Sequence, residues 1–589
     1  MRNVLSLLTG APNRIFLTRG DSGINAYSAN GFRPSMVLDF FRNFYVGVDR
    51  RTQNPSDIVT YGTPGLALMT DSDGFQKWNP HNLALNSATP ATQSITVVSG
   101  NDYTVEITGT GSVTLSGAGT GTVTAGSPVE VTASTTTLTL TVSGSPSTLS
   151  TYRSDQGGMA PVPLGQRVAG SETYVPTTSA AVYIPRENSY LYDADTDTWI
   201  NNGLFLEAEA RTQLLHTTNV LVTQSHTVTA VPHTLHFTGT GTVTLSGAST
   251  AGPLVGTGTG NQNRVSLTFT PTAASLTLTV TGTVSDAQLE VGSTPSSYIP
   301  NPAASGTVTR AAETAVIEPE NNPLIEVGPE LVTNGDGSTL TGWTAAGDTI
   351  AVADGEFSVT GGTGAGYLYQ SFPTVIGQNY LLSGDITKLG NNFEGVRKSD
   401  NSGATINVEN LTGANGVLGS HTLIFTATAA TTFIILQNND TVNAAKFDNI
   451  SVKSLSMPTA LSIGLKGKVT GASSTFINWT ADADNGLLVQ SSASDFTFTQ
   501  EAATVVDTVT GGSYTSGINV PFNIASRHGN TFINGAVDGT ALTANTTPTA
   551  LADLTTADFQ IGPDFMGHIT QVVLYSDDIE DTGLEEITQ

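Results

Sequence analysis

The sequence predicts an all-β protein made of tandem antiparallel β-sandwich domains in an elongated multidomain chain. Among its 589 residues, 62 are Gly and only 12% are charged, whereas Thr, Ser and Val are frequent. Thr and Val favour strands, and Gly disfavours helices. Short segments in which apolar and hydroxyl-bearing residues alternate, and the repetition of such segments, indicate the same class. At roughly 150 residues per domain, the length corresponds to about four domains.

The repetition indicates a duplicated β-module. Residues 108–118 read TGTGSVTLSGA and residues 238–248 read TGTGTVTLSGA, while Leu138–Gly144 (LTLTVSG) recurs as Leu276–Gly282 (LTLTVTG). Apolar side chains alternate with hydroxyls, as in half-buried strands, and Gly marks the turns. The offset between the copies grows from 130 to 138 residues, so the second copy holds about eight extra residues. We place them in a loop such as 250–263.

Each copy follows a segment that contains a strand, an aspartate-rich turn and a Trp, at 58–83 and at 183–215. In the second segment, Asp193, Asp195 and Asp197 are interpreted as the polar tip of a hairpin rather than as a calcium loop. The reason is that the glycine and the closing glutamate of an EF-hand loop are missing.

The second half of the chain predicts two further sandwiches. Six short alternating segments, separated by Gly and Asn turns, indicate the first sandwich: 356–360, 367–372, 380–386, 422–427, 432–437 and 447–452. A last unit adds strands and one short acidic helix at its end. The predicted boundaries are an N-terminal region at 1–80, copy 1 at 81–157, a connector with a β-hairpin at 158–205, copy 2 at 206–302, a linker at 303–328, and the two sandwiches at 329–456 and 457–589.

Charge is unevenly distributed along the chain. The net charge is −27 at pH 7, yet the first 51 residues carry seven arginines and three aspartates, a net +4. An acidic body repels nucleic acid and anionic membranes, so neither is an expected partner. The basic start would dock on an acidic partner; chance clustering in an ordinary domain is the equal alternative. The arginines concerned are Arg2, Arg14, Arg19, Arg33, Arg42, Arg50 and Arg51.

Two absences narrow the class of protein. The chain has no Cys, which excludes disulfides, thiolate metal sites and a Cys nucleophile. The run Val4–Leu8 is too short for the core of a signal peptide, and no stretch approaches the roughly 20 apolar residues of a membrane span. We therefore expect a protein that is assembled inside a cell or released from it by lysis, without membrane insertion.

Part of the second half resembles a known family of sandwiches. The strings GPELVTNGDGSTLTGWT (Gly328–Thr344), YLYQSFPTVIGQNYLLSGDIT (Tyr367–Thr387) and FDNISVK (Phe447–Lys453) resemble galactose-binding-like domains and carbohydrate-binding modules. Members of this family usually have an aromatic residue after N-G-D, where this chain has Gly337. The resemblance implies a β-sandwich fold for residues 329–456.

The C-terminal unit resembles laminin-G/concanavalin-like jelly rolls, on the strings RHGNTFINGAVDGT (Arg527–Thr540) and FQIGPDFMGHITQVVLYSDDIEDTGLEEIT (Phe559–Thr588). Its ending, G-H-I…V-V-L-Y-S before an acidic helix, also resembles the ends of many bacteriophage structural proteins. The resemblance implies a jelly-roll fold for residues 457–589. Laminin-G-like domains often hold calcium, so a Ca²⁺ ion in this domain is a further hypothesis without assigned ligands.

Phrases in the first half resemble tail-fibre and minor structural proteins of tailed bacteriophages. The phrases follow one another along the chain, and their order is more specific than any of them alone. They are VLDFFRNFYVGVDRR (Val37–Arg51), NLALNS (Asn82–Ser87), EAEARTQLL (Glu207–Leu215), DAQLEVGSTPSSYIPN (Asp286–Asn301) and TVTRAAE (Thr307–Glu313).

No pattern in the sequence indicates catalysis, so no catalytic residue is assigned. The eight histidines show no metal-ligand spacing, and no nucleophile elbow, Walker loop or dinucleotide fingerprint is present. His233 and His236 would lie on opposite faces of a strand, which argues against a shared metal. Glycoside hydrolysis by paired carboxylates is the alternative, although the acids of the last domain show no E-x-D-x-E signature.

Glycan binding is the favoured chemistry. Carbohydrate sites place aromatic rings against the apolar face of a sugar and use polar side chains for its hydroxyls. Trp343 and Trp479 have a structural alternative, because an aromatic residue in a sandwich most often packs in the core. The candidate glycan-binding residues are Tyr367, Tyr369, Asn478, Trp479 and Asp482.

Taken together, the sequence predicts a virion structural protein of a tailed bacteriophage, a tail fibre, spike or similar appendage. Its basic N-terminus would attach it to other virion proteins, and its C-terminal sandwiches would contact host-surface glycans. A homo-oligomer, most often a trimer in such appendages, is expected. The alternatives are a capsid or head–tail decoration protein with a purely structural role, and a glycan-depolymerising tailspike.

Overall fold

The computed structural model describes residues 23–48, 51–52, 54–62, 65–346, 349–361, 366–390, 394–412, 416–471 and 473–589. Within these residues the chain forms 47 strands and one α-helix, α1 (Glu580–Ile587). Strand pairing within the sheets is antiparallel. The predicted all-β class with tandem antiparallel sandwiches is confirmed. In the described part of the chain, no helix is both long and apolar enough to span a membrane.

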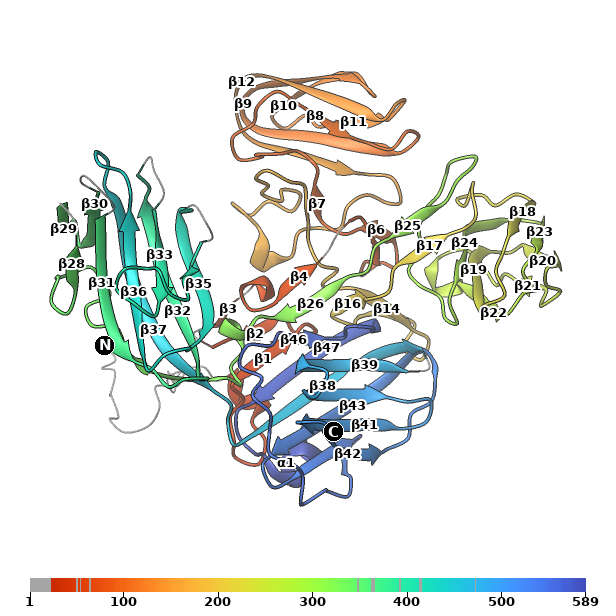
Figure 1. Ribbon diagram of the computed structural model, residues 1–589. Helices are drawn as coiled ribbons and strands as arrows, with labels where there is room; N and C mark the ends of the chain where they lie inside the picture. The colour runs from red at the N-terminus through yellow and green to blue at the C-terminus, as the bar shows by residue number, and fades with distance from the viewer. Residues whose placement is uncertain are drawn as a thin grey trace.

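Three lobes lie around a jelly roll that is at the bottom of the view (Figure 1). Copy 1 of the repeat lies at the top of the view in orange, copy 2 at the right in yellow and green, and a sandwich of residues 326–456 at the left in green and teal. The jelly roll is formed chiefly by residues 460–589, in blue. The units therefore follow one another in sequence, while in space the first three lie around the last.

The jelly roll consists of two sheets that enclose a common apolar core. The first sheet has the order β3–β2–β1–β47–β38–β43–β44–β45, with β16 also paired to β47, and the second has the order β4–β26–β46–β39–β40–β41–β42. The C-terminal part supplies β38 (Ala460–Gly471), β39 (Ser474–Asp482), β40 (Asn485–Ser491), β41 (Phe496–Ala502), β42 (Val505–Gly511), β43 (Gly517–Gly529), β44 (Ile533–Val537), β45 (Thr540–Ala541), β46 (Phe559–Ile561) and β47 (Met566–Tyr575).

The N-terminal strands belong to the first of these sheets. β1 (Met36–Asp39) pairs with β47, and β2 (Phe44–Val46) and β3 (Arg51–Thr52) continue the sheet to its edge. Met36 and Leu38 enter the jelly-roll core, whereas Val37 packs in a second cluster that includes a leucine of α1. Burial on both faces accounts for the unbroken apolar run of β1. The N-terminal region predicted at 1–80 differs from the structure in this respect, because its described strands do not stand apart from the C-terminal unit.

Three more strands join the jelly roll, one from the N-terminal part of the chain and two from the middle. β16 (Leu204–Glu207) pairs with β47, and β26 (Thr314–Ile317) lies between β4 (Thr60–Gly62) and β46. Their apolar side chains enter the same core. The jelly roll thus takes strands from four separate parts of the chain. Each lobe is formed by the chain segment that connects two successive parts of the jelly roll.

The two copies of the repeat share one strand order. In copy 1, the long strands β9 and β12 pair along their whole length and carry β8, β10 and β11 at their ends. In copy 2, the same arrangement is divided into the sheets β18–β23–β20–β21 and β22–β19–β24. The strands are β8 (Gln93–Thr96), β9 (Asp102–Gly117), β10 (Gly121–Thr124), β11 (Val129–Thr132) and β12 (Thr137–Arg153), then β18 (Gln224–Thr227), β19 (His233–Gly239), β20 (Thr242–Gly247), β21 (Leu254–Val255), β22 (Val265–Phe269), β23 (Ser275–Thr281) and β24 (Val284–Val291).

The copies differ in the connection between two strands. Four residues, 125–128, join β10 to β11, whereas nine residues, 256–264, join β21 to β22. The longer connection includes a short 3-10 helix, Asn261–Asn263. Most of the extra length of copy 2 therefore lies in and beside the predicted loop 250–263.

Matching buried amides close the two modules. Asn82 Nδ2 donates to the carbonyls of Leu149 and Val175, at 2.9 Å each. Gln213 Nε2 donates to the carbonyls of Ala287 and Ile299, at 2.8 and 3.2 Å. In each copy the amide oxygen accepts two backbone N–H groups, so the side chain replaces missing sheet hydrogen bonds.

The third lobe is a sandwich of two antiparallel sheets, β29–β30–β37–β32–β35, with β27 also paired to β37, and β28–β31–β36–β33–β34. Trp343 packs in its core, and its Nε1 donates to the carbonyl of Thr333 at 3.0 Å. The strands are β27 (Glu326–Glu330), β28 (Thr344–Ala346), β29 (Thr349–Ala353), β30 (Glu356–Thr360), β31 (Gly366–Pro373), β32 (Asn379–Lys388), β33 (Glu394–Ser399), β34 (Glu409–Asn410), β35 (Gly419–Thr426), β36 (Thr431–Asn438) and β37 (Ala445–Ser456).

One sheet of this sandwich contacts the jelly roll. Leu381 of β32 and Ile424 of β35 pack against the jelly-roll core. Asn379 Nδ2 donates to Asp553 Oδ2 and to Thr555 Oγ1, at 3.2 and 2.9 Å. Because these contacts use the sheet that contains β32, the outer face of the other sheet is turned away from the jelly roll.

Candidate functional site

The outward-turned sheet of the third lobe brings two predicted glycan-binding residues together. Tyr367 and Tyr369 alternate with buried residues along β31, so both half-buried rings lie on the outer face. Tyr367 lies opposite Gln437 of β36, and Tyr369 lies opposite Ile435. Two positions along a strand correspond to about 7 Å. The two rings therefore form a short aromatic strip on the surface of the sheet.

Polar groups continue this strip across the sheet. Arg397 of β33 lies opposite Ile435 and, on its other side, opposite Asn410 of β34. Gln437 Oε1 and Asn410 Oδ1 are shielded from solvent and accept no hydrogen bond within the described residues. A buried polar atom without a partner costs about 1–3 kcal/mol, which a donor group of a ligand would recover. We call Tyr367, Tyr369, Arg397, Asn410 and Gln437 the tyrosine face.

Trp479 has no place in such a site. Its side chain is fully buried in the jelly-roll core beside Phe559, and its Nε1 donates to the carbonyl of Ala557 at 3.0 Å. A sugar cannot reach this ring, so the prediction of a ligand-facing Trp479 is wrong. The reason is that β39 carries Trp479 on its inward face, where the ring fills the space between the two sheets.

Asn478 and Asp482 also lie in the jelly roll, away from the tyrosines. Asn478 is half-buried on β39, and its Oδ1 accepts from Thr480 Oγ1 at 2.8 Å. Asp482 is exposed at the turn into β40, where its carboxylate accepts from the N–H of Asp484 and from Asn485 Nδ2. These hydrogen bonds lower the pKa of Asp482 and hold the turn. The five predicted residues therefore divide between two domains.

The predicted docking arginines are only partly described. Arg2, Arg14, Arg19 and Arg50 lie outside the described residues. Arg33, Arg42 and Arg51 are exposed on the N-terminal segment of the jelly roll. Arg42 forms an ion pair of 2.8 Å with Asp39, and the guanidinium of Arg51 lies 4.6 Å from the ring centre of Phe44. Docking on a virion protein stays a prediction for all seven.

A buried ionic network occupies the junction between the lobes and the jelly roll. Arg186 of the connector forms ion pairs with Glu207 of β16, at 2.8 Å, and with Glu313 of the linker, at 2.5 Å. Arg310 Nε lies 3.2 Å from Glu207. Burial raises the pKa of Glu207, but Arg310, Arg186 and hydrogen bonds from Ser297 outweigh burial and lower it to about 2. The network fixes four chain segments to one another.

Beside this network lies a cavity of about 450 Å³, which we call the junction cavity. This volume is in the usual range of small-molecule sites. The cavity is lined by the hairpin β14–β15 (Tyr190–Asp193 and Thr198–Asn201), the hairpin β5–β6 (Leu68–Thr70 and Gln76–Trp78), the extra loop of copy 2, and the jelly roll. Six of its side chains are Tyr192, Trp199, Asn261, Arg264, Tyr298 and Lys468.

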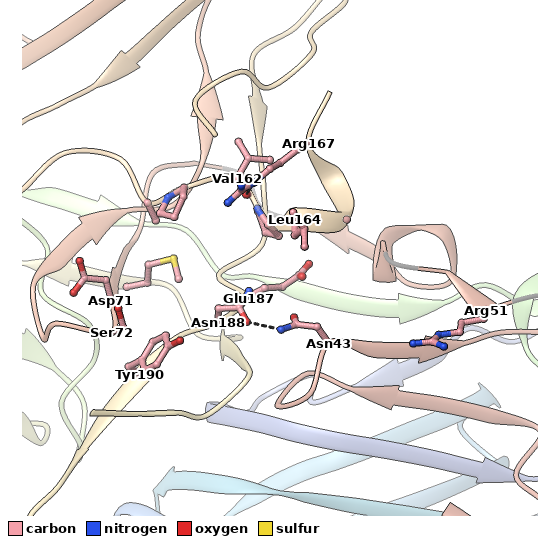
Figure 2. Close-up of a pocket in the computed structure, with 15 residues that line it drawn as sticks. Asn43, Arg51, Asp71, Ser72, Val162, Leu164, Arg167, Glu187, Asn188 and Tyr190 are labelled. Atoms are coloured by element: carbon pink, nitrogen blue, oxygen red, sulfur yellow. Dashed lines mark hydrogen bonds between the residues drawn. The ribbon is translucent and has the colours of Figure 1, made fainter. Parts of the chain in front are cut away.

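A second cavity, of about 390 Å³, lies on the other side of Tyr190. Figure 2 shows Glu187 beside the hydrogen bond between Asn43 and Asn188, with Leu164 above it. Glu187 is 3% exposed, and its Oε1 accepts from Gln166 Nε2 at 2.8 Å. Burial raises the pKa of Glu187 to about 8, so this carboxyl group is protonated at neutral pH.

Neither cavity is predictable from the sequence. The buried ionic network, in contrast, involves residues that lie in sequence segments already singled out. Glu207, Ser297, Arg310 and Glu313 all lie in the phage-like phrases, and the structure brings them into contact. In the structure these residues join the copy-2 module to the jelly roll. The aspartates Asp193 and Asp195 form a hairpin tip, where Asp193 Oδ1 accepts the N–H of Asp195 at 3.1 Å.

No group of three or more His, Asp or Glu side chains arranged to hold a metal ion was found in the described part of the chain. His233 and His236 are both buried in β19. Burial lowers the pKa of His236, so its ring is neutral. Its Nδ1 accepts from Arg264 Nη1 at 3.0 Å, which fixes the tautomer with hydrogen on Nε2.

No family model matches the chain, and no curated protein matches it at a significant level. Matching solved structures include one described as "Cell entry of botulinum neurotoxin type C is dependent upon interaction with two ganglioside molecules", 7% identical over 42% of this chain and 45% of that chain, with a TM-score of 0.18. Another is the binding domain of botulinum neurotoxin DC in complex with SialylT, 11% identical over 42% and 51%, with a TM-score of 0.20. The chain spans about half the length of these structures. TM-scores this far below 0.5 carry no information about function.

Proposed function

We propose that this chain is a structural protein of a bacteriophage virion, a tail fibre, spike or similar appendage, and that its tyrosine face holds glycans of the host surface. The virion assignment is supported by the ordered phage-like phrases of the sequence. The glycan assignment is supported by one observation above all. Two outward tyrosines lie beside hydrogen-bonding atoms that have no partner within the described residues.

The chemistry of the tyrosine face suits a sugar. The apolar face of a pyranose ring packs on Tyr367 and Tyr369, and a shift of the surrounding side chains on binding would uncover Gln437 Oε1 and Asn410 Oδ1 as acceptors for its hydroxyls. Such a shallow face gives weak binding, with a Kd on the order of millimolar, or about −4 kcal/mol. Several copies on one particle raise the overall affinity by ~10²–10⁴, provided that all can reach the surface at once.

The position of the face suits attachment to a cell. The sandwich is held to the jelly roll by the sheet that contains β32, so the tyrosine face is turned away from the jelly roll. Attachment to the particle is assigned to the arginines of residues 1–51 and to other virion proteins. Assembly as a homotrimer would present three tyrosine faces together.

The test uses the purified full chain and intact host cells, together with oligosaccharides released from their surface. Tyr367→Ala and Tyr369→Ala should each weaken binding, because each removes one ring of the strip. Tyr152→Ala is the matched control, since Tyr152 is half-buried on β12 of copy 1. Equal binding by the wild type and both variants would contradict the glycan assignment.

A second measurement separates the virion assignment from the glycan assignment. Antibodies against the jelly roll should label an appendage of the imaged particle. Labelling of the capsid shell, without binding of the purified chain to cells, would instead support the decoration role. Release of reducing ends from host polysaccharide by the purified chain would establish a depolymerising spike.

A further inference from the structure

The junction cavity contains two cations, Arg264 and Lys468, that form no close ion pair with a described carboxylate. Neither Arg264 nor Lys468 forms an ion pair within 4.0 Å among the described residues, in a chain with 49 acidic and 22 basic side chains. The carboxylates that interact with them electrostatically, Asp286 with Arg264 and Asp193 with Lys468, lie beyond that distance. An arginine that is desolvated without a counter-ion is costly, and a bound anion offsets the cost.

Arg264 is held rigidly and keeps donors free for a ligand. Its Nε donates to Asn261 Oδ1 at 3.2 Å, and its Nη1 donates to the carbonyl of Asp286 at 2.9 Å and to His236 Nδ1 at 3.0 Å. The ring of Tyr298 lies 5.5 Å from the guanidinium carbon. No hydrogen bond from Nη2 is found within the described residues. Because the Arg264 side chain is fixed before binding, little conformational entropy is lost when a ligand binds to it.

Aromatic rings and amides complete the lining. Tyr192 and Trp199 lie on paired strands, with ring centroids 5.4 Å apart, and both are half-buried. A Cβ atom at Gly74 would lie 2.3 Å from the indole of Trp199, so the glycine is needed for the ring to reach its place. Asn261 Nδ2 donates to Thr70 Oγ1 at 2.9 Å, which fixes the third polar group.

The loop that supplies Asn261 and Arg264 is the part of copy 2 that copy 1 lacks. In copy 1, the corresponding connection has only four residues, 125–128. The largest difference in connection length between the two copies, nine residues against four, thus falls on the loop that lines the junction cavity. The two copies can be compared directly, because they share the same strand order and differ in the loop that lines the cavity.

We infer that the junction cavity is a binding site for an anionic saccharide, whose carboxylate or sulfate group pairs with Arg264 and Lys468 while a sugar ring packs on Trp199 and Tyr192. The site lies in a different part of the molecule from the tyrosine face, and its ligand is defined by an anionic group that the tyrosine face does not require. The inference therefore stands or falls independently of the proposed function.

The experiment uses the full chain and three acidic probes: trigalacturonate, 3′-sialyllactose and a sulfated chondroitin tetrasaccharide. Each is paired with its carboxyl-reduced or desulfated counterpart, which separates a carboxylate source of the anion from a sulfate source. Tryptophan fluorescence is a selective readout. Of the four Trp residues, Trp78, Trp343 and Trp479 are 3%, 8% and 0% exposed, so a change on binding reports Trp199.

At least one acidic probe should change the fluorescence, and its neutral counterpart should bind at least about tenfold more weakly, as loss of one charge-assisted hydrogen bond implies. Lys468→Gln should weaken binding about tenfold, and Trp199→Phe should abolish the fluorescence change. Lys466→Gln is the matched control, because Lys466 lies two positions away on β38 but lines another cavity. Lys468→Gln and Lys466→Gln leave the apolar core unchanged, so both variants should fold.

Three results would overturn the inference. The first is the absence of binding by all three acidic probes at about 10 mM, a concentration above the weak end of saccharide affinities. The second is equal binding of an acidic probe and its neutral counterpart. The third is equal weakening by Lys466→Gln and Lys468→Gln, which would assign the effect to net charge rather than to the cavity.

Discussion

Arg186 and Glu207 form an ion pair of 2.8 Å in which both side chains are excluded from solvent. Glu207→Gln leaves Arg186 and Arg310 without full compensation, and loss of one member of a buried pair costs about 3–5 kcal/mol. We expect this loss in the thermal unfolding of the full chain at pH 7. Glu172→Gln is the control, because Glu172 is 63% exposed in its pair with Arg167, and such a pair contributes below about 1 kcal/mol.

The same pair predicts a dependence on pH. The pKa of Glu207 is about 2 in the folded chain, below the roughly 4.3 of an unfolded glutamate. Its stabilisation is therefore complete above pH 4.3 and is lost as the pH falls toward 2. The difference between wild type and Glu207→Gln should shrink over that window. A difference that stays constant down to pH 2 would contradict the assignment.

Glu187 predicts a pH dependence of opposite sign. Its folded pKa of about 8 lies above the unfolded value, so the unfolded state releases the proton first and stability falls as the pH rises from about 4.3 to 8. Glu187→Gln keeps a neutral group of the same shape. The variant should be close to the wild type at pH 4.5 and more stable by about 5 kcal/mol at pH 8.5, since each unit of pKa difference corresponds to about 1.4 kcal/mol. If the stability difference between Glu187→Gln and the wild type is the same at pH 4.5 and pH 8.5, the pKa of Glu187 is not raised in the folded chain.

Asn82 and Gln213 predict that the two modules lose stability separately. Asn82→Ala removes an amide that makes four buried hydrogen bonds, and unsatisfied buried groups cost about 1–3 kcal/mol each. Hydrogen exchange should accelerate in copy 1 and stay unchanged in copy 2. Gln213→Ala should produce the reverse pattern. Gln262→Ala, at an exposed amide of the cavity loop, should change neither module.

Substitutions at Trp479 and at Tyr369 should have separate effects, the first on stability and the second on glycan binding. Trp479→Phe removes the hydrogen bond to the carbonyl of Ala557 and part of a core side chain, at a cost of about 2–4 kcal/mol. Glycan binding by the folded fraction should not change. Tyr369→Ala should weaken binding with little change in the melting temperature. A loss of glycan binding in the folded Trp479→Phe variant would contradict the conclusion that Trp479 has only a structural role.

The elements that the sequence predicts best are those set by local periodicity. The alternation in Leu138–Gly144 and its repeat gives strands that the structure contains as β12 and β23, because one face of each strand is buried. The alternation around Tyr367 and Tyr369 likewise predicts which rings face outward. Trp479 has the same local pattern, and only the second sheet of the jelly roll decides that its ring is covered.

What the sequence could not supply is pairing between distant segments. The run Met36–Leu38 reads as one more buried strand, and nothing local indicates that its neighbour is β47, more than 500 residues away. The junction cavity has the same origin, since its lining comes from two hairpins, the copy-2 loop and the jelly roll. Arg264 and Lys468 look like ordinary surface cations until these pieces are assembled.

The pairing of β1 with β47 has a consequence for how the polypeptide matures on the ribosome. The lobes close upon themselves and can fold as soon as each emerges, whereas the sheet of the jelly roll that contains β1 must wait for β47, which is made more than 500 residues later. Until then, the first strands present open edges that invite wrong partners. Translation that stops early should therefore leave well-formed lobes on an unfinished, aggregation-prone jelly roll.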